Sequence, residues 1–298
     1  MKYILHTKQM TSIRVLVCAW VVLGALQADG IVRRDDVADQ EYIDLGANFP
    51  AVGLLSHGGT TRGSGVLIAQ EDGAPSRWVL TAAHIHTPNT FEVGGNAYGV
   101  ESFTRHPDWG GDEGGPPGSG IANDIALVEL SLAVSNVTPM KWHDTDGDLG
   151  TGLEVFTVGL GLSGTGLTGE GGSVGTLRAA ENTISAMGSS ALVTPVATAM
   201  EYTFHHHDDT NARDLEGMAV LYDSGGPVVA DFGSGNVVIG IHSYVRDNDG
   251  SGRGTYGDDL GATRVPLYDD WITETIPEPH SLVLLLGGFL LLRLFKRR

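Results

Sequence analysis

The chain has 298 residues, including 43 glycines, and a net charge of −18. Seven of its 18 Lys and Arg residues lie before residue 31 or after residue 275, so the stretch between is more acidic still. This balance argues against nucleic acid as a partner, because contacts to phosphate need Lys and Arg. Short apolar runs rich in Val, Ile and Thr, separated by glycine, favour strands and turns over long helices.

Residues 1–30 have the layout of a secretory signal peptide. Three basic residues precede the apolar run 15–26, and the small residues Ala28 and Gly30 follow it. A buried N-terminal helix is the alternative. The only cysteine, Cys18, lies inside this segment, so the remaining chain has no disulfide and its core holds the fold by packing alone. For an exported protein, this fits a bacterial source better than an animal one.

The C-terminal residues 276–298 contain Pro-Glu-Pro at 277–279, an apolar run at 282–295 and three terminal basic residues. As a helix the run reaches about 21 Å, short of the roughly 30 Å of a bilayer core. The three parts in this order resemble the PEP-CTERM sorting signal of bacterial exported proteins. The resemblance implies transient retention in the inner membrane, cutting by an exosortase-type enzyme, and release to the cell surface or outside. A plain membrane anchor is the alternative.

Between these ends, the strand patterns come in two sets. The first set covers residues 49–56, 66–69, 78–84 and 91–103, and then 125–130 after an exposed glycine-rich loop at 110–120. The acidic segment 139–152 is predicted to connect the halves. The second set starts at residue 155, includes 237–245 and a glycine-acidic loop at 247–259, and ends with 263–272. Two sets of short strands predict two packed barrels or sandwiches.

A turn at residues 222–227, Tyr-Asp-Ser-Gly-Gly-Pro, precedes an apolar strand. Glycines let a substrate approach the main chain, which suits a nucleophilic serine, although such a sequence is also an ordinary turn. His84 ends one predicted strand and Asp124 enters another, so the chain offers Ser224 a base and an orienting acid. Spacing along the sequence does not establish that the three meet.

Three motifs stand in the same order as these residues: Thr-Ala-Ala-His at 81–84, Asn-Asp-Ile-Ala-Leu at 123–127 and Asp-Ser-Gly-Gly-Pro at 223–227. They resemble the motifs of trypsin-like (chymotrypsin-fold) serine proteases, in particular the bacterial members without disulfides. The resemblance implies an all-β fold of two six-stranded antiparallel β-barrels with a short C-terminal helix. The protease domain would span residues 31–275, with barrel one at about 31–142 and barrel two at about 150–275.

The resemblance also implies roles for individual residues. His84 would be the general base, Asp124 its orienting acid and Ser224 the acylated nucleophile, with protein or peptide as substrate and no cofactor. The oxyanion would bind to the backbone N–H groups of Tyr222 and Ser224. Tyr222 stands where the family has glycine, and a side chain restricts the angles that aim this N–H. Loss of one such donor costs about 100- to 1000-fold in rate.

The N-terminus offers a second point of resemblance. Gly-Ile-Val at 30–32 resembles the activated start of the family, where the freed amine of Ile31 would pair with Asp223. Signal cleavage before Ile31 would then create the activating amine by itself. One alternative is cleavage before Asp29. Another is that Ile31 simply begins an ordinary first strand.

The predicted specificity pocket contains Met218, Ser243 and Val245. Met218 stands six residues before the serine and is not an acid, so the resemblance does not support cleavage after Arg or Lys. Val245 would narrow the entrance of the pocket, which favours a substrate with a small or medium apolar residue before the cut bond. Ser243 to Val245 would pair with extended substrate by strand addition.

Two further segments have metal-ligand composition. Residues 205–209, His-His-His-Asp-Asp, carry imidazoles and carboxylates, but consecutive residues rarely converge on one ion. Residues 144–148 alternate acids as calcium loops do, but lack the glycine and glutamate that an EF-hand loop needs. Both are predicted to be solvated loops without a metal, with a metal site at 205–209 and a calcium role at 144–148 as the alternatives. The sequence as a whole predicts an exported serine endopeptidase, with a weak or inactive peptide-binding module as the alternative.

Overall fold

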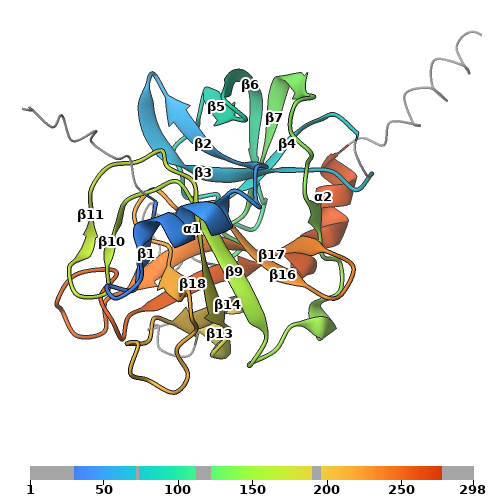
Figure 1. The fold of residues 1–298 in the computed structure, drawn as a ribbon. Helices are drawn as coiled ribbons and strands as arrows, with labels where there is room; N and C mark the ends of the chain where they lie inside the picture. The colour runs from blue at the N-terminus through green and yellow to red at the C-terminus, as the bar shows by residue number, and fades with distance from the viewer. Residues whose placement is uncertain (1–29, 72–73, 112–121, 190–195, 277–298) are drawn as a thin grey trace, which may run out of the picture.

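A computed structural model describes residues 30–71, 74–111, 122–189 and 196–276 (Figure 1). The predicted signal peptide and sorting signal therefore lie outside the described residues, apart from Gly30 and Ile276. In the part of the chain that is described, no helix is both long and apolar enough to span a membrane.

The first half is a closed barrel in which the strands follow the order β2-β3-β4-β7-β6-β5. Its strands are β2 (Val52–His57), β3 (Thr60–Ile68), β4 (Ser76–Thr81), β5 (Thr90–Val93), β6 (Asn96–Arg105) and β7 (Ala126–Val134). Apolar side chains fill its interior, and Leu55, Leu80, Phe91 and Leu127 are fully buried. This confirms the six-stranded first barrel.

The second half is an open sheet with the strand order β12-β9-β16-β17-β18-β14-β13, and β8 pairs with β17. The strands are β8 (Lys141–Trp142), β9 (Glu154–Gly159), β12 (Arg178–Thr183), β13 (Ala186–Ser189), β14 (Val196–Thr203), β16 (Pro227–Asp231), β17 (Asn236–Arg246) and β18 (Asp259–Arg264). Six of these strands were expected to form a closed barrel. Instead, the edge strand β12 packs against helix α1 (Asp39–Gly46), and the fully buried Arg178 of β12 forms a 2.6 Å ion pair with Asp39 of that helix.

A small sheet of order β11-β10-β1-β15 holds the first described strand, β1 (Ile31–Arg33), in the second half. The other strands are β10 (Ser163–Thr165), β11 (Gly169–Gly171) and β15 (Gly217–Met218). Ile31 and Val32 are fully buried among the apolar side chains of that half. The expected boundary of barrel one therefore differs from the structure, where residues 31–33 pair with strands of the second half.

Short helical segments complete the fold: η1 (Asp146–Asp148), η2 (Val265–Tyr268) and the C-terminal helix α2 (Asp269–Thr275). The predicted short C-terminal helix is confirmed, and its Ile272 is fully buried. One apolar core runs through both halves, because first-barrel residues cluster with Val229, Val238 and Ile241 of the second sheet. The two halves thus pack as one body, and the site lies where they meet.

Candidate active site

His84 and Asp124 meet because their strands are neighbours in the first barrel. β4 pairs with β7, with Thr81 opposite Ala126, so the end of β4 lies beside the start of β7. Nδ1 of His84 lies 2.7 Å from Oδ2 of Asp124, and the backbone N–H of His84 donates to Oδ1 at 2.8 Å. Asp124 is 1% exposed. A buried carboxylate at Nδ1 fixes the ring so that its other nitrogen can accept a proton.

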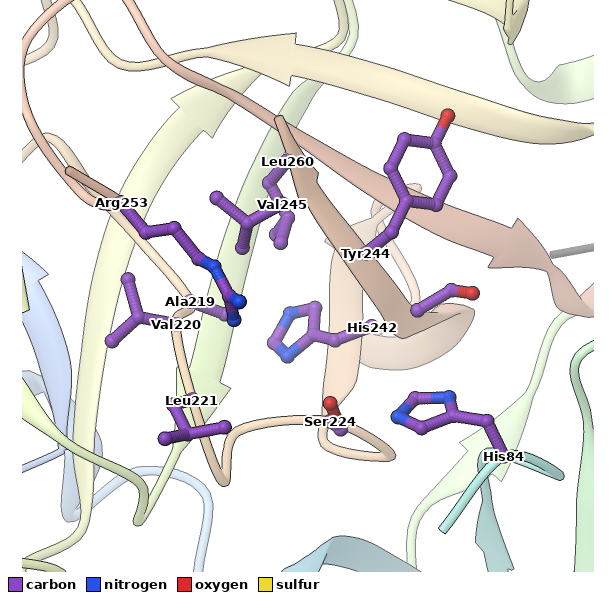
Figure 2. Close-up of a pocket in the computed structure, with 11 residues that line it drawn as sticks. His84, Ala219, Val220, Leu221, Ser224, His242, Tyr244, Val245, Arg253 and Leu260 are labelled. Atoms are coloured by element: carbon purple, nitrogen blue, oxygen red, sulfur yellow. The ribbon is translucent and has the colours of Figure 1, made fainter. Parts of the chain in front are cut away.

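Ser224 belongs to the turn between β15 and β16, in the second half. It lines the same pocket as His84. Figure 2 shows a ring nitrogen of His84 pointing toward the Ser224 hydroxyl. Residues that are far apart in the sequence therefore come together as base, orienting acid and hydroxyl.

The first barrel holds the serine turn in place. The backbone N–H of Ser64 in β3 donates to the Ser224 carbonyl at 2.8 Å, and the Ser64 hydroxyl donates to the Tyr222 carbonyl at 3.0 Å. Gly225 has φ +84°, and a Cβ at this position would collide with Thr81 and the Ser64 carbonyl. Only glycine fits this close approach without strain.

His242 of β17 supports the same turn from the second half. Its backbone N–H donates to the Gly226 carbonyl and its carbonyl accepts from Gly225, both at 2.9 Å. Its ring lies 2.9 Å from the Thr157 hydroxyl and 3.3 Å from the Asp223 carbonyl. Burial lowers the pKa of His242 to about 3, so the ring is neutral at ordinary pH. No role for His242 was predicted from the sequence.

Asp124 has further partners in the second half. The Ser243 hydroxyl donates to its Oδ2, and the Thr263 hydroxyl donates to its carbonyl at 3.1 Å. Ser243, predicted as a pocket residue, does line the pocket, and it also contacts the carboxylate that orients His84. On the other side, the Arg105 guanidinium donates to the carbonyls of Ala83 and Ile85, which flank His84. Sequence reasoning missed Arg105 because no motif marks it.

Tyr222 adopts the backbone conformation that a glycine would take freely. Its φ is +69°, in the left-handed region that disfavours residues with a side chain. Within the described ranges, neither its N–H nor that of Ser224 has a hydrogen-bond partner. Both predicted oxyanion donors are therefore available to a ligand.

Ile31 and Asp223, the predicted activation pair, are in contact. The Ile31 nitrogen lies 3.4 Å from Oδ2 of Asp223, which also accepts from the Val220 N–H at 3.0 Å, while Oδ1 accepts from the Gly161 N–H. Asp223 is fully buried, and burial raises its pKa to about 7. Because Gly30 still precedes Ile31 here, the nitrogen is an amide and carries no charge.

The pocket beside Ser224 has a volume of about 320 Å³ and differs in its lining from the expectation. Met218 does not line it: this residue is fully buried in β15, opposite Val32 of β1. Val245 does line it, as predicted. Arg253 and Leu260 also line it, and sequence reasoning missed both. One feature of the sequence could have singled out Arg253: it is the only basic residue in the acidic loop at 247–259.

The segment predicted to pair with substrate has an open edge. On one side, β17 pairs with β18 as far as Arg246. On its other side, β16 pairs with β17 only as far as Ile241. Residues 243–246 therefore have no strand neighbour on that side among the described residues, which leaves room for an extended peptide.

The two candidate metal segments differ from one another. In 144–148, Asp146 accepts two hydrogen bonds from Arg264, and Asp148 lies 3.0 Å from His143, so these carboxylates are already paired. In 205–209, His206 and His207 lie with Asp35, and each offers a ligand atom within 4.8 Å of the others. Two of these groups already have partners, because Asp35 accepts a 2.6 Å hydrogen bond from the Tyr256 hydroxyl and Nδ1 of His206 accepts one from the Asp208 N–H. The expected solvated loop therefore stays a prediction.

Comparisons with known proteins agree with the observed fold. The family model described as Trypsin matches residues 46–272. The chain is similar to the solved structure of neuropsin, a serine protease expressed in the limbic system of mouse brain. The two share 22% identity with a TM-score of 0.57, over 77% of this chain and 95% of that chain. No match was found among curated proteins. Because the family model covers well over half of the sequence, the chain belongs to the trypsin family of serine proteases.

Proposed function

We propose that this protein is an exported serine endopeptidase that cleaves peptide bonds through an acyl-enzyme. The observation that carries the proposal is the pair of His84 and the buried Asp124, 2.7 Å apart, with His84 facing Ser224 in one pocket (Figure 2). A serine hydroxyl is a weak nucleophile until a base removes its proton, and this geometry supplies the base and its orienting group.

In the first half-reaction, the Ser224 oxygen attacks the peptide carbonyl carbon while the second ring nitrogen of His84 takes the hydroxyl proton. Asp124 stabilises the resulting imidazolium through Nδ1–H. The unpartnered N–H groups of Tyr222 and Ser224 bind the negative oxygen of the tetrahedral intermediate. His84 then returns its proton to the leaving amine, the C–N bond breaks, and an ester on Ser224 remains.

In the second half-reaction, His84 takes a proton from water, and the hydroxide attacks the ester carbon. Collapse of the second tetrahedral intermediate releases the acid product and returns the proton to the Ser224 oxygen. Extended substrate is held by hydrogen bonds to residues 243–246 of β17, where the strand edge is open. The pocket lining includes no acidic residue, which argues against a preference for Arg or Lys before the cut bond.

The proposal is tested by hydrolysis of an unfolded protein such as casein. The wild-type chain is expected to release peptides, and Ser224→Ala and His84→Ala are each expected to lose at least about 1000-fold in rate. If the correctly folded wild type releases no peptides, the alternative of a peptide-binding module with a protease fold replaces the enzyme.

We also propose that the two ends are processed during export. Residues 1–30 would be removed as a signal peptide, and the Pro-Glu-Pro segment at 277–279 would be cut by an exosortase-type enzyme after transient retention in the inner membrane. The proposal rests on the order of basic, apolar and small residues at each end. Sequencing of both ends of the secreted protein tests it: an N-terminus at Ile31 is expected, and an intact C-terminus at residue 298 would contradict the proposed cut.

A further inference from the structure

The pocket beside Ser224 combines apolar walls with one permanently charged side chain. Ala219, Val220 and Leu260 are buried and form apolar parts of the lining. Arg253 comes from the loop between β17 and β18. Figure 2 shows its side chain extending into the pocket, with the guanidinium directed toward the His242 side. Of the eleven lining residues, none is acidic.

The backbone around Arg253 is fixed on both sides. Its carbonyl accepts a 2.8 Å hydrogen bond from the Glu170 N–H. The next N–H, of Gly254, donates to the fully buried Asp258 at 2.9 Å. Gly254 has φ +83°, and a Cβ there would lie 2.9 Å from Val32 and 3.0 Å from Val220. This close packing fixes the main chain from which the Arg253 side chain extends into the pocket.

The guanidinium of Arg253 has no hydrogen-bond or ion-pair partner anywhere in the described ranges. The acids of its own loop are engaged elsewhere: Asp247 accepts from the N–H groups of Gly250 and Gly252, and Asp258 accepts from the backbone of its own turn. The chain has a net charge of −18, and most arginines among the described residues pair with carboxylates, as Arg34, Arg178 and Arg264 do. Arg253 instead offers its donors to whatever enters the pocket.

We propose that Arg253 makes this pocket selective for an acidic side chain, Glu or Asp, in the residue before the cut bond; the inference rests on the proposed peptidase activity. The substrate carboxylate would accept from the planar guanidinium, and its methylene groups would pack against Val220 and Val245. This differs from the small or medium apolar preference expected from Val245 alone. A lysine or arginine substrate is disfavoured, because it would bring a second cation to Arg253.

The test uses the full chain and fluorogenic peptides that differ only in the residue before the cut bond: Glu, Gln, Asp, Ala, Leu or Lys. Glu and Gln have nearly the same shape, so their ratio isolates the charge. The wild type is expected to cleave the Glu peptide about 10- to 100-fold better than the Gln peptide in kcat/KM. A Glu-to-Gln ratio near one, or a best rate with Ala or Leu, would overturn the inference.

Variants separate charge from folding. Arg253→Gln is expected to bring the Glu-to-Gln ratio to within about threefold of one, and Arg253→Glu to favour the Lys peptide over the Glu peptide. Arg77→Gln is the matched control, because Arg77 is a partly exposed arginine on β4 that pairs with Glu129 outside the pocket, and it should leave the ratio unchanged.

The rate at which a fluorophosphonate labels Ser224 distinguishes failure of this inference from failure of the proposed function. Arg253→Gln should be labelled within about twofold of the wild-type rate, because the probe carries no acidic side chain. Loss of labelling in this variant would mean that Arg253 supports the fold, and would overturn its role in selectivity. If the wild type is neither labelled nor active on any peptide, the peptidase proposal itself fails.

Discussion

The backbone nitrogen of Ile31 lies 3.4 Å from Oδ2 of Asp223, the residue directly before the proposed nucleophile. Asp223 is fully buried and accepts three backbone N–H groups, one each from Ile31, Gly161 and Val220. A protonated amine at Ile31 would place a positive charge against this carboxyl, which a peptide N–H does not. We therefore expect cleavage before Ile31 to affect the conformation of the serine turn.

Cleavage before Ile31 is expected to increase activity. A protein that starts at Ile31 should have a kcat/KM at least about tenfold above that of a protein that keeps Asp29 and Gly30, because the ion pair stabilises the turn that carries both oxyanion donors. In the protein that starts at Ile31, Asp223→Asn should remove the gain, while Ile31→Val, which keeps the amine, should retain it. Equal activity of the two forms would contradict an activating role for this amine.

The two forms should also differ in how their stability depends on pH. In the uncleaved chain, burial raises the pKa of Asp223 to about 7 and lowers that of His242 to about 3. Between about pH 4 and 6.5, folded Asp223 holds a proton that the unfolded chain lacks, so its contribution to stability falls as pH rises. Over the same range, unfolded His242 holds a proton that the folded chain lacks, so its contribution rises with pH. The contributions of Asp223 and His242 to the pH dependence of stability therefore have opposite signs.

With a charged amine at Ile31, Asp223 ionises at lower pH. It then no longer contributes to the pH dependence of stability between about pH 4 and 6.5. Of these two contributions, only that of His242 then remains. From pH 6.5 to 4.5, the free energy of unfolding of the cleaved form should fall by about 2 to 3 kcal/mol more than that of the uncleaved form. Denaturant titrations of both forms at the two pH values measure this difference, and identical slopes would rule out the coupling between Ile31 and Asp223.

Tyr222 is predicted to be a tolerated departure from glycine. Its φ of +69° costs a residue with a side chain about 1 to 2 kcal/mol, which a glycine avoids. Tyr222→Gly should therefore keep or raise kcat, while Tyr222→Val, with a β-branched side chain, should lower it. The comparison requires kcat for all three proteins. A loss of tenfold or more in Tyr222→Gly would instead assign a direct function to the tyrosine side chain.

Ser243 is predicted to position Asp124. Ser243→Ala removes the hydroxyl that donates to Oδ2 of Asp124 and leaves a buried acceptor with one partner fewer. We expect kcat to fall by about 5- to 20-fold, with KM changing less, because the loss acts on the orientation of His84 and not on substrate contacts. Ser131→Ala is the control, since Ser131 donates to the Gly99 carbonyl on the outside of the first barrel. An equal effect of both variants would argue against a positioning role.

The sequence predicted those parts of the site that are linear motifs. His84, Asp124 and Ser224 each stand beside a predicted strand, and Ile31 could be paired with Asp223 by resemblance to the family. Residues whose role depends on distant contacts were missed. Arg105 reaches the His84 loop from another strand, and His242 supports the serine turn through three contacts.

The pocket and the second half were the least predictable. Met218 was predicted to line the pocket because it stands six residues before Ser224 in the sequence. Instead, the pairing of β15 with β1 directs its side chain into the core. Arg253 enters from a loop whose path is set by buried Asp258 and by the packing of Gly254, and neither is visible in the sequence. The second sheet ends at β12, where Glu181 bridges to Glu216 and helix α1 packs nearby, and the strand patterns alone did not show these contacts.

The central claim is that Ser224 is a nucleophile activated by His84. Mass spectrometry of the protein after treatment with a fluorophosphonate tests it most directly, because the adduct can be assigned to one peptide. The account predicts one adduct on the peptide that contains Ser224, absent from Ser224→Ala and formed at least about 100-fold more slowly in His84→Ala. A folded protein that starts at Ile31 and forms no adduct, or forms it on another residue, would contradict the account.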